Sequence, residues 1–129
     1  MIGILLDTHI LLWALYEPQR LTAHTKTILE NPDRDVWFSA ASIWEVAIKQ
    51  SLGRPDFTAS PFDVRSEALR IDFRELRIDG LQAAQATALP TLHNDPFDRL
   101  LVAQAQSTGL TLWTRDPLVM QYPGPIDAV

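Results

Sequence analysis

The chain has 129 residues, a length that predicts one domain spanning residues 1–129. Cys is absent, which excludes a disulfide scaffold, a thiolate zinc site and a thiol nucleophile. The formal net charge of −5 argues against a basic surface for nucleic acid. No segment is apolar enough to cross a bilayer and the start lacks the basic residues of a signal peptide. We therefore expect a soluble cytoplasmic protein with no membrane partner.

The first half of the chain alternates short apolar runs with segments of helical spacing. Asp7 and Thr8 follow the first apolar run and can cap a helix, as can Thr22 further on. Gly53 closes the last of these segments. We predict strands over 2–6 and 36–38, and helices around 10–14, 22–31 and 43–52.

The second half repeats the pattern. Ser60 with Pro61 begins one helix, Asp79 caps an Ala-rich one, and Asp95 with Pro96 opens the most apolar one. We predict strands over 76–78 and 110–113, helices over 61–71, 79–89 and 97–107, and a helical turn around 118–121. Strands separated by helices indicate an α/β protein with a central parallel sheet.

Acidic residues gather where this arrangement places the edge of the sheet. Asp7 and Asp116 follow predicted strands, and Glu45, Asp95 and Asp98 lie in the first turns of helices. The carboxyl ends of parallel strands share one edge with the amino ends of the helices that follow them, so these acids should converge there. Each also has an ordinary explanation, as a helix cap, a turn residue or one partner of a surface ion pair.

Asp98 is the acid that these ordinary explanations fit least well. It shares a helical stripe with Leu101, Val102 and Ala105, so its carboxylate should point towards the core. Inward carboxylates need counter-charge, which Arg99 and Arg115 could supply and which Mg²⁺ supplies better.

The remaining residues narrow the chemistry of this predicted metal site. His9, His24 and His93 are scattered, which disfavours zinc, and we expect His9 and His93 to be polar residues at the rim. The chain has no glycine-rich phosphate loop and no G-x-S-x-G elbow. Hydrolysis of a phosphodiester by a metal-activated water fits best, because it needs no covalent nucleophile.

Four blocks, residues 5–13, 39–49, 93–105 and 112–116, closely resemble the PIN-domain family, and within it the VapC-type toxins of bacterial toxin–antitoxin pairs. The resemblance extends over essentially the whole chain. It implies a three-layer α/β/α sandwich and an endoribonuclease that depends on Mg²⁺ or Mn²⁺. The family's acidic quartet, both catalytic and metal-binding, falls on Asp7, Glu45, Asp98 and Asp116.

Other residues of these blocks are expected to support the quartet or contact RNA. They are Thr8, Asp95, Arg99, Thr114 and Arg115. Asp95 is assigned to capping first and to the metal shell second. Lys49 and Lys26 are further candidate phosphate contacts, and each of these basic residues could equally be a solvated surface charge.

The resemblance also implies partners: an RNA substrate, a cognate antitoxin, and a homodimer or toxin–antitoxin hetero-oligomer. Trp13, Leu15, Tyr16 and Trp44 are candidate partner surface, although core packing explains them too and is favoured for Trp44. The alternative function is a non-catalytic PIN-like module that binds RNA or protein. A flap-type DNA nuclease would need substrate arches for which 129 residues leave no room.

Overall fold

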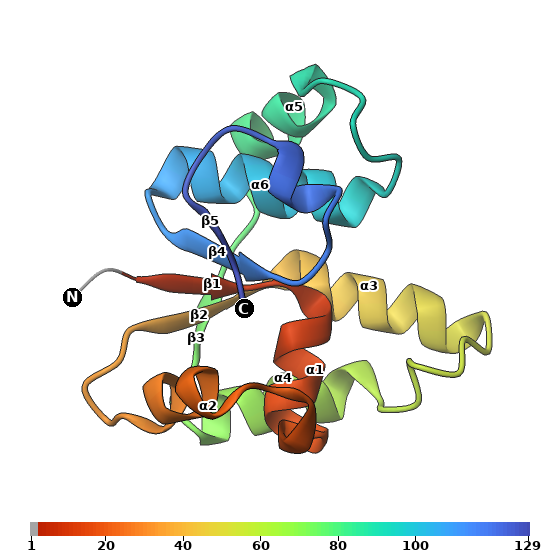
Figure 1. Cartoon of the computed structure of the whole chain (residues 1–129). Coiled ribbons are helices and arrows are strands. Elements are labelled where there is room, and N and C mark those ends of the chain that lie inside the picture. Colours follow the sequence, from red (N-terminus) through yellow and green to blue (C-terminus); the bar gives the residue numbers. More distant parts are fainter. Residues whose placement is uncertain (1–2) are drawn as a thin grey trace.

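The computed structural model describes residues 3–129 and alternates strands with helices along the chain (Figure 1). The strands are β1 (Ile4–Leu6), β2 (Val36–Ser39), β3 (Arg74–Leu76), β4 (Thr111–Thr114) and β5 (Ile126–Ala128). The helices are α1 (Thr8–Tyr16), α2 (Ala23–Glu30), α3 (Ala40–Ser51), α4 (Pro61–Arg70), α5 (Gly80–Ala88) and α6 (Pro96–Thr108), with short 3-10 turns η1 (Pro18–Arg20) and η2 (Val119–Gln121).

The strands of the described chain form one five-stranded sheet in the order β3-β2-β1-β4-β5. Every neighbouring pair is parallel; Leu5 at the centre pairs with Trp37 of β2 and with Leu112 of β4. Helices α1, α2 and α4 cover one face of the sheet, and α5 and α6 cover the other (Figure 1). The predicted α/β/α sandwich with a central parallel sheet is therefore confirmed.

The central strand β1 is wholly apolar because both faces of the sheet are covered. Successive side chains of a strand point to opposite faces. Leu6 accordingly packs with Ile10 and Phe38 on one side. Leu5 packs with Leu101 on the other. Asp7, the next residue, is thereby held at the end of a fully buried strand.

The predicted elements agree with the structure except at the two edges of the sheet. The strand predicted over 76–78 was wrong by two residues, since β3 is Arg74–Leu76, and β5 was not predicted. Edge strands face water and need no apolar run; the exposed Arg74 stacks on Trp37 instead. Ile2, where the first predicted strand begins, lies outside the described residues. No helix within residues 3–129 is long and apolar enough to cross a membrane.

A buried side-chain amide connects three helices of the sandwich by hydrogen bonds. Gln104 of α6 is fully buried, accepts a hydrogen bond from Ser39 at 2.5 Å, and donates to the Arg77 carbonyl and to Gln82, both at 3.2 Å. Because Ser39 caps α3, the network joins the start of α3 to α5 and α6.

Gln104→Leu is expected to lower the free energy of unfolding by about 1–3 kcal/mol, because it removes three hydrogen bonds and leaves the buried Ser39 hydroxyl without its acceptor. Chemical denaturation measures the change. Gln106→Leu, at an exposed position of the same helix, is the matched control and should cost less than about 1 kcal/mol. Equal losses for the two variants would show that the buried network contributes nothing.

Candidate metal centre

Asp7 links the centre of the sheet to the start of α1. One carboxylate oxygen accepts a hydrogen bond from the Ile10 backbone N–H at 2.8 Å and caps the helix. The other accepts from the Thr114 hydroxyl at 2.6 Å, and that hydroxyl accepts from the Asp116 backbone N–H at 3.1 Å. Burial raises the pKa of Asp7, against the opposing effect of the hydrogen bonds from Thr114 and Ile10. Thr114 therefore couples β4 and the Asp116 turn to Asp7.

Glu45 of α3 is 2% exposed, and both of its carboxylate oxygens have partners. The Thr8 hydroxyl donates to one of them at 2.5 Å, and the buried Ser42 hydroxyl lies 2.9 Å from that of Thr8. The Lys49 ammonium donates to the other at 2.5 Å and to Asp95 at 3.2 Å. Burial would lower the pKa of Lys49, but the hydrogen bond and charge of Glu45, followed by Asp95, raise it.

The His93 side chain contacts the carboxylates of both Asp98 and Asp116. Its Nε2 lies 2.9 Å from a carboxylate oxygen of each acid. Its Nδ1 accepts the Asp95 backbone N–H at 3.1 Å, which assigns the ring proton to Nε2 and makes His93 a donor to Asp116, with the Asp98 carboxylate at the same distance. The three side chains also form a possible metal-binding group, with one ligand atom from each within 4.8 Å of the others.

His93 is thus a residue whose place the sequence analysis missed. The expected rim position was wrong: its side chain is 14% exposed and contacts two acids of the quartet. The Tyr122 hydroxyl accepts its backbone N–H at 2.9 Å and helps fix it there. Its position five residues before Asp98, in a loop that returns to the start of α6, was the signal available in the sequence.

Asp98 shows how strongly the acids affect one another. Burial, and then the negative charges of Asp95, Glu45, Asp7 and Asp116, raise its pKa to about 8. All five acids predicted from the sequence therefore lie close enough to interact. A cluster of carboxylate oxygens that disfavours its own ionisation fits a hard divalent cation of the Mg²⁺ or Mn²⁺ kind.

The raised pKa of Asp98 predicts how the metal-free protein responds to pH. Because the folded-state pKa of about 8 lies above the ordinary 3.8, the protonated carboxyl stabilises the fold. That stability is fully present below about pH 4 and is lost as pH rises through about 8. In chelator, the melting temperature should fall from pH 5 to pH 9, as calorimetry can measure. A melting temperature that rises over this range would contradict the assignment.

Arg99 and Arg115, the expected counter-charges, bond elsewhere. Arg99 donates to the carbonyls that end α5, those of Ala86, Thr87 and Leu89. Arg115 donates to the carbonyls of Val129 and Arg20, with its guanidinium 4.8 Å from the centroid of Trp13. Carbonyls at a helix end lack partners within the helix, and an arginine fork satisfies several at once. Lys26 lines a separate hollow beneath α2.

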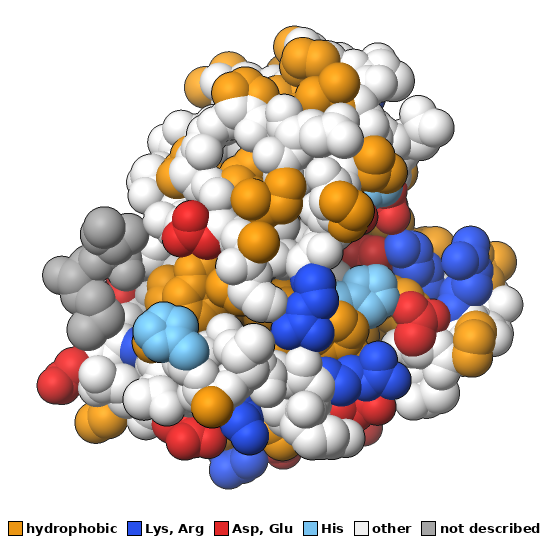
Figure 2. Space-filling view, in the orientation of Figure 1, with side chains coloured by type: hydrophobic (Ala, Val, Ile, Leu, Met, Phe, Trp, Pro, Cys, Tyr) orange, Lys and Arg blue, Asp and Glu red, His pale blue; other side chains and the backbone are white. Residues whose placement is uncertain are grey.

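The candidate partner residues lie in different environments. Trp44 is 58% exposed, so the favoured interpretation as core packing was wrong; its ring lies 5.3 Å from that of Phe97, edge to face. Trp13 and Leu15 pack against the core, whereas Tyr16 is 44% exposed. On the face in Figure 2, acidic and basic side chains are interspersed among apolar ones.

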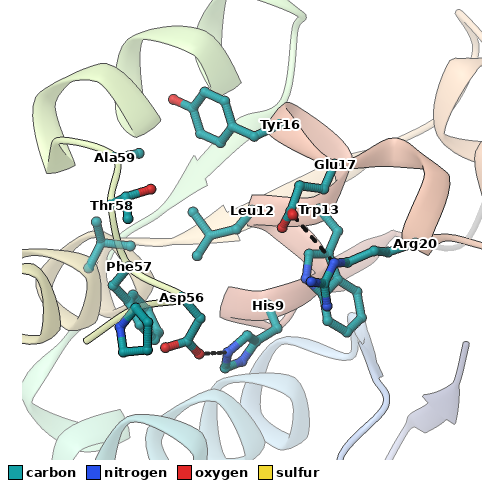
Figure 3. A pocket seen from close by; sticks show the side chains of 12 residues that line it. His9, Leu12, Trp13, Tyr16, Glu17, Arg20, Asp56, Phe57, Thr58 and Ala59 are labelled. Carbon is teal, nitrogen blue, oxygen red and sulfur yellow. Dashed lines mark hydrogen bonds and ion pairs between the residues drawn. The ribbon is translucent and has the colours of Figure 1, made fainter.

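A hollow of about 710 Å³ lies along α1, facing the loop between α3 and α4 (Figure 3). His9 stands at one end and pairs with Asp56 at 2.9 Å. Leu12, Trp13 and Phe57 supply apolar lining. A second hollow of about 430 Å³ shares Tyr16 and Ala59 with the first and continues towards α4.

The parallel sandwich and the acids at the carboxyl edge of its sheet define a class of protein. The sequence profile of the PIN domain matches residues 4–121, and the chain belongs to the PIN-domain family. Ribonuclease VapC22 of Mycobacterium tuberculosis is 32% identical over 126 residues, which cover 97% of this chain and 95% of that relative. The resemblance to VapC-type proteins is thereby confirmed.

Solved structures share the fold. The DNA-bound VapBC structure from Salmonella typhimurium matches with a TM-score of 0.69 and 18% identity over 99% of this chain and 98% of that one. VapBC2 from Rickettsia felis, bound to a promoter DNA fragment, matches with a TM-score of 0.67 and 15% identity over 98% of this chain and 98% of that one. FitAcB from Neisseria gonorrhoeae matches with a TM-score of 0.56 and 26% identity over 90% of this chain and 89% of that one.

Proposed function

We propose that this chain, as one domain of residues 1–129, is a metal-dependent endoribonuclease, the toxin of a toxin–antitoxin pair. The observation that carries the proposal is the convergence of five acids at one sheet edge, with the pKa of Asp98 raised to about 8. A relative named as a ribonuclease, similar over nearly the whole chain, supports RNA as the substrate. An RNA substrate also favours a cytoplasmic location.

Asp7, Asp98 and Asp116, with Glu45 directly or through water, are the residues proposed to hold Mg²⁺ or Mn²⁺. When bound, such a cation polarises the scissile phosphate and lowers the pKa of the attacking water. The neighbouring hydroxyls and His93 keep the carboxylates in position: Thr114 for Asp7, Thr8 for Glu45. Outer partners of this kind orient ligands.

The experiment that tests the function is brief induction in a bacterial host followed by sequencing of RNA ends. The wild-type protein should stop growth and produce new RNA ends at defined sites, which also identifies the RNA. Asp7→Asn, which keeps the shape of the side chain, should do neither. Growth arrest with an unchanged set of RNA ends would refute the ribonuclease assignment.

The second candidate is a non-catalytic PIN-like module that binds RNA or protein. The exposed Trp44 next to Phe97 is the observation that favours it, since exposed rings suit stacking on a base or packing on a partner. Thermal shift separates the two cheaply, because only a true metal site raises the melting temperature with Mg²⁺ or Mn²⁺.

The two joined hollows along α1 support the antitoxin as a partner. Their lining combines apolar side chains with the acids Glu17, Asp56, Asp63 and Glu67, of which Glu17 pairs with Arg20 and Asp56 with His9. This lining suits an antitoxin segment whose apolar side chains are flanked by basic ones. The VapBC and FitAcB structures with the same fold are consistent with such a pairing.

A homodimer is proposed on the outer face of α3. Trp44, Ile48 and Leu52 recur every four residues there and are 58%, 40% and 65% exposed. An exposed apolar stripe of this kind, along a helix and its cap residue, suits packing against a second helix. Light scattering on the antitoxin-free protein should give a dimer, and Trp44→Asp should shift it to a monomer.

A further inference from the structure

The five acids of the metal centre divide into groups with different partners. His93 Nε2 lies 2.9 Å from a carboxylate oxygen of Asp98 and 2.9 Å from one of Asp116. Glu45 and Asp95, by contrast, share the Lys49 ammonium, at 2.5 Å and 3.2 Å. One side of the cluster therefore already contains a positive charge that belongs to the chain.

The surroundings of the Lys49 ammonium hold it in place. Its side chain is only 17% exposed, and Nζ lies 5.2 Å from the ring centroid of Phe57 and 5.8 Å from that of Phe97. Cations near aromatic faces are attracted to them, more strongly where water is excluded. The ammonium is thus fixed by two carboxylates and two rings, unlike the exposed pair of Arg70 with Glu67 on α4.

A second divalent ion on the side of Glu45 and Asp95 would need the oxygens that Lys49 uses. Paired metal ions in hydrolytic sites lie about 3.5–4 Å apart and share a limited set of carboxylates. The other Asp95 oxygen caps α6 by accepting the backbone N–H of Phe97 at 2.9 Å, so a second metal would have to share Asp95 with two existing donors. The buried Glu45 is held by Thr8 on its other side. A second metal would have to displace the ammonium and would be repelled by it.

We propose that the Lys49 ammonium takes the place of a second divalent ion, so that each chain binds one divalent cation. Lys49 is then a resident cation of the site, in place of the solvated surface charge or phosphate contact that the sequence allows. The inference rests on the proposed function, since it assumes that the acidic centre binds a divalent cation.

Titration with Mn²⁺, followed by calorimetry and electron paramagnetic resonance, tests the proposal on the antitoxin-free protein. The wild-type chain should bind one Mn²⁺. Lys49→Met keeps an apolar stem of similar length and removes the charge, so it should bind two, with the spectrum of a coupled pair. Lys49→Arg, which retains the charge, and Arg70→Met, which removes a remote one, should each bind one.

Two Mn²⁺ ions in the wild-type chain or in Lys49→Arg would overturn the proposal, whether or not Lys49→Met folds. A folded Lys49→Met that binds one would overturn it as well. An RNA cleavage assay run in parallel separates this outcome from failure of the proposed function. One bound Mn²⁺ without cleavage supports the inference and contradicts the ribonuclease, whereas no bound Mn²⁺ contradicts both.

Discussion

Asp98→Asn is expected to abolish RNA cleavage and, at the same time, to stabilise the metal-free protein. Asn has nearly the same shape but cannot ionise, so it removes a charge that burial and four neighbouring acids oppose. The melting temperature in chelator at pH 8 should rise by about 3 °C or more. Loss of a proposed metal ligand should lower cleavage by at least about 100-fold and remove stabilisation by Mn²⁺.

This combination of lost activity and gained stability distinguishes a functional acid from a structural one. Asp33→Asn, in the exposed turn before β2, is the control and should leave both cleavage and melting temperature unchanged. An Asp98→Asn protein that melts below the wild type in chelator would show that the carboxylate stabilises the fold. One that still cleaves RNA at wild-type rate would exclude Asp98 from the centre.

Tyr16→Asp is expected to weaken binding of the antitoxin by about 30-fold or more, the size of effect found for aromatic anchors at interfaces. Tyr16 lines both hollows along α1 and is 44% exposed, so the fold should tolerate the change. Burial, followed by the charges of Glu67 and Asp63, already raises the pKa of its hydroxyl. The substitution replaces the ring with a short hydrated carboxylate and so removes the apolar contact that an antitoxin segment would make there.

Calorimetric titration of the toxin with its antitoxin measures this effect. Leu81→Asp on α5 is the matched control: it puts the same charge at a position 66% exposed on the opposite layer of the sandwich. The affinity of Leu81→Asp for the antitoxin should stay within about threefold of that of the wild type. A Tyr16→Asp protein that binds as tightly as the control would place the antitoxin on another surface.

The central strand and the helix from Pro96 could be predicted because the patterns that indicate them lie within short segments of the sequence. A short apolar run such as Ile4–Leu6, followed at once by a helix cap, indicates a strand covered on both faces, and Asp7 is that cap at the edge of the sheet. The helix from Pro96 likewise had its cap, its proline and its apolar stripe in the sequence. The edge strands carried no such pattern, since one side of each faces water.

The partners of the acids could not be predicted in the same way. Arg99 lies beside Asp98 in the sequence, yet its side chain points along α6 to the carbonyls that end α5. Lys49 reaches the site because one helical turn separates it from Glu45, and the packing of α3 against α6 adds Asp95. The position of His93 beside the acids depends on how the loop before α6 folds back. The i,i+4 spacing of Glu45 and Lys49 indicates their ion pair, but the other contacts follow from tertiary packing, which residue spacing does not encode.

The net charge of −5 at first argued against nucleic acid. Four of the acids behind this charge are proposed to share one centre, where a bound divalent cation would offset part of the −5. The face in Figure 2 carries both signs rather than a basic patch. Binding of RNA should therefore depend strongly on the metal and only modestly on surface lysines and arginines.

Cleavage of RNA by the purified, antitoxin-free protein is the most direct test of a metal-dependent ribonuclease centred on these acids. With Mg²⁺ or Mn²⁺ the wild-type protein should cut RNA at internal positions. Excess EDTA should stop the reaction, and added Mn²⁺ should restore it. Cleavage that continues in EDTA, or that persists undiminished in Asp7→Asn, would contradict the account.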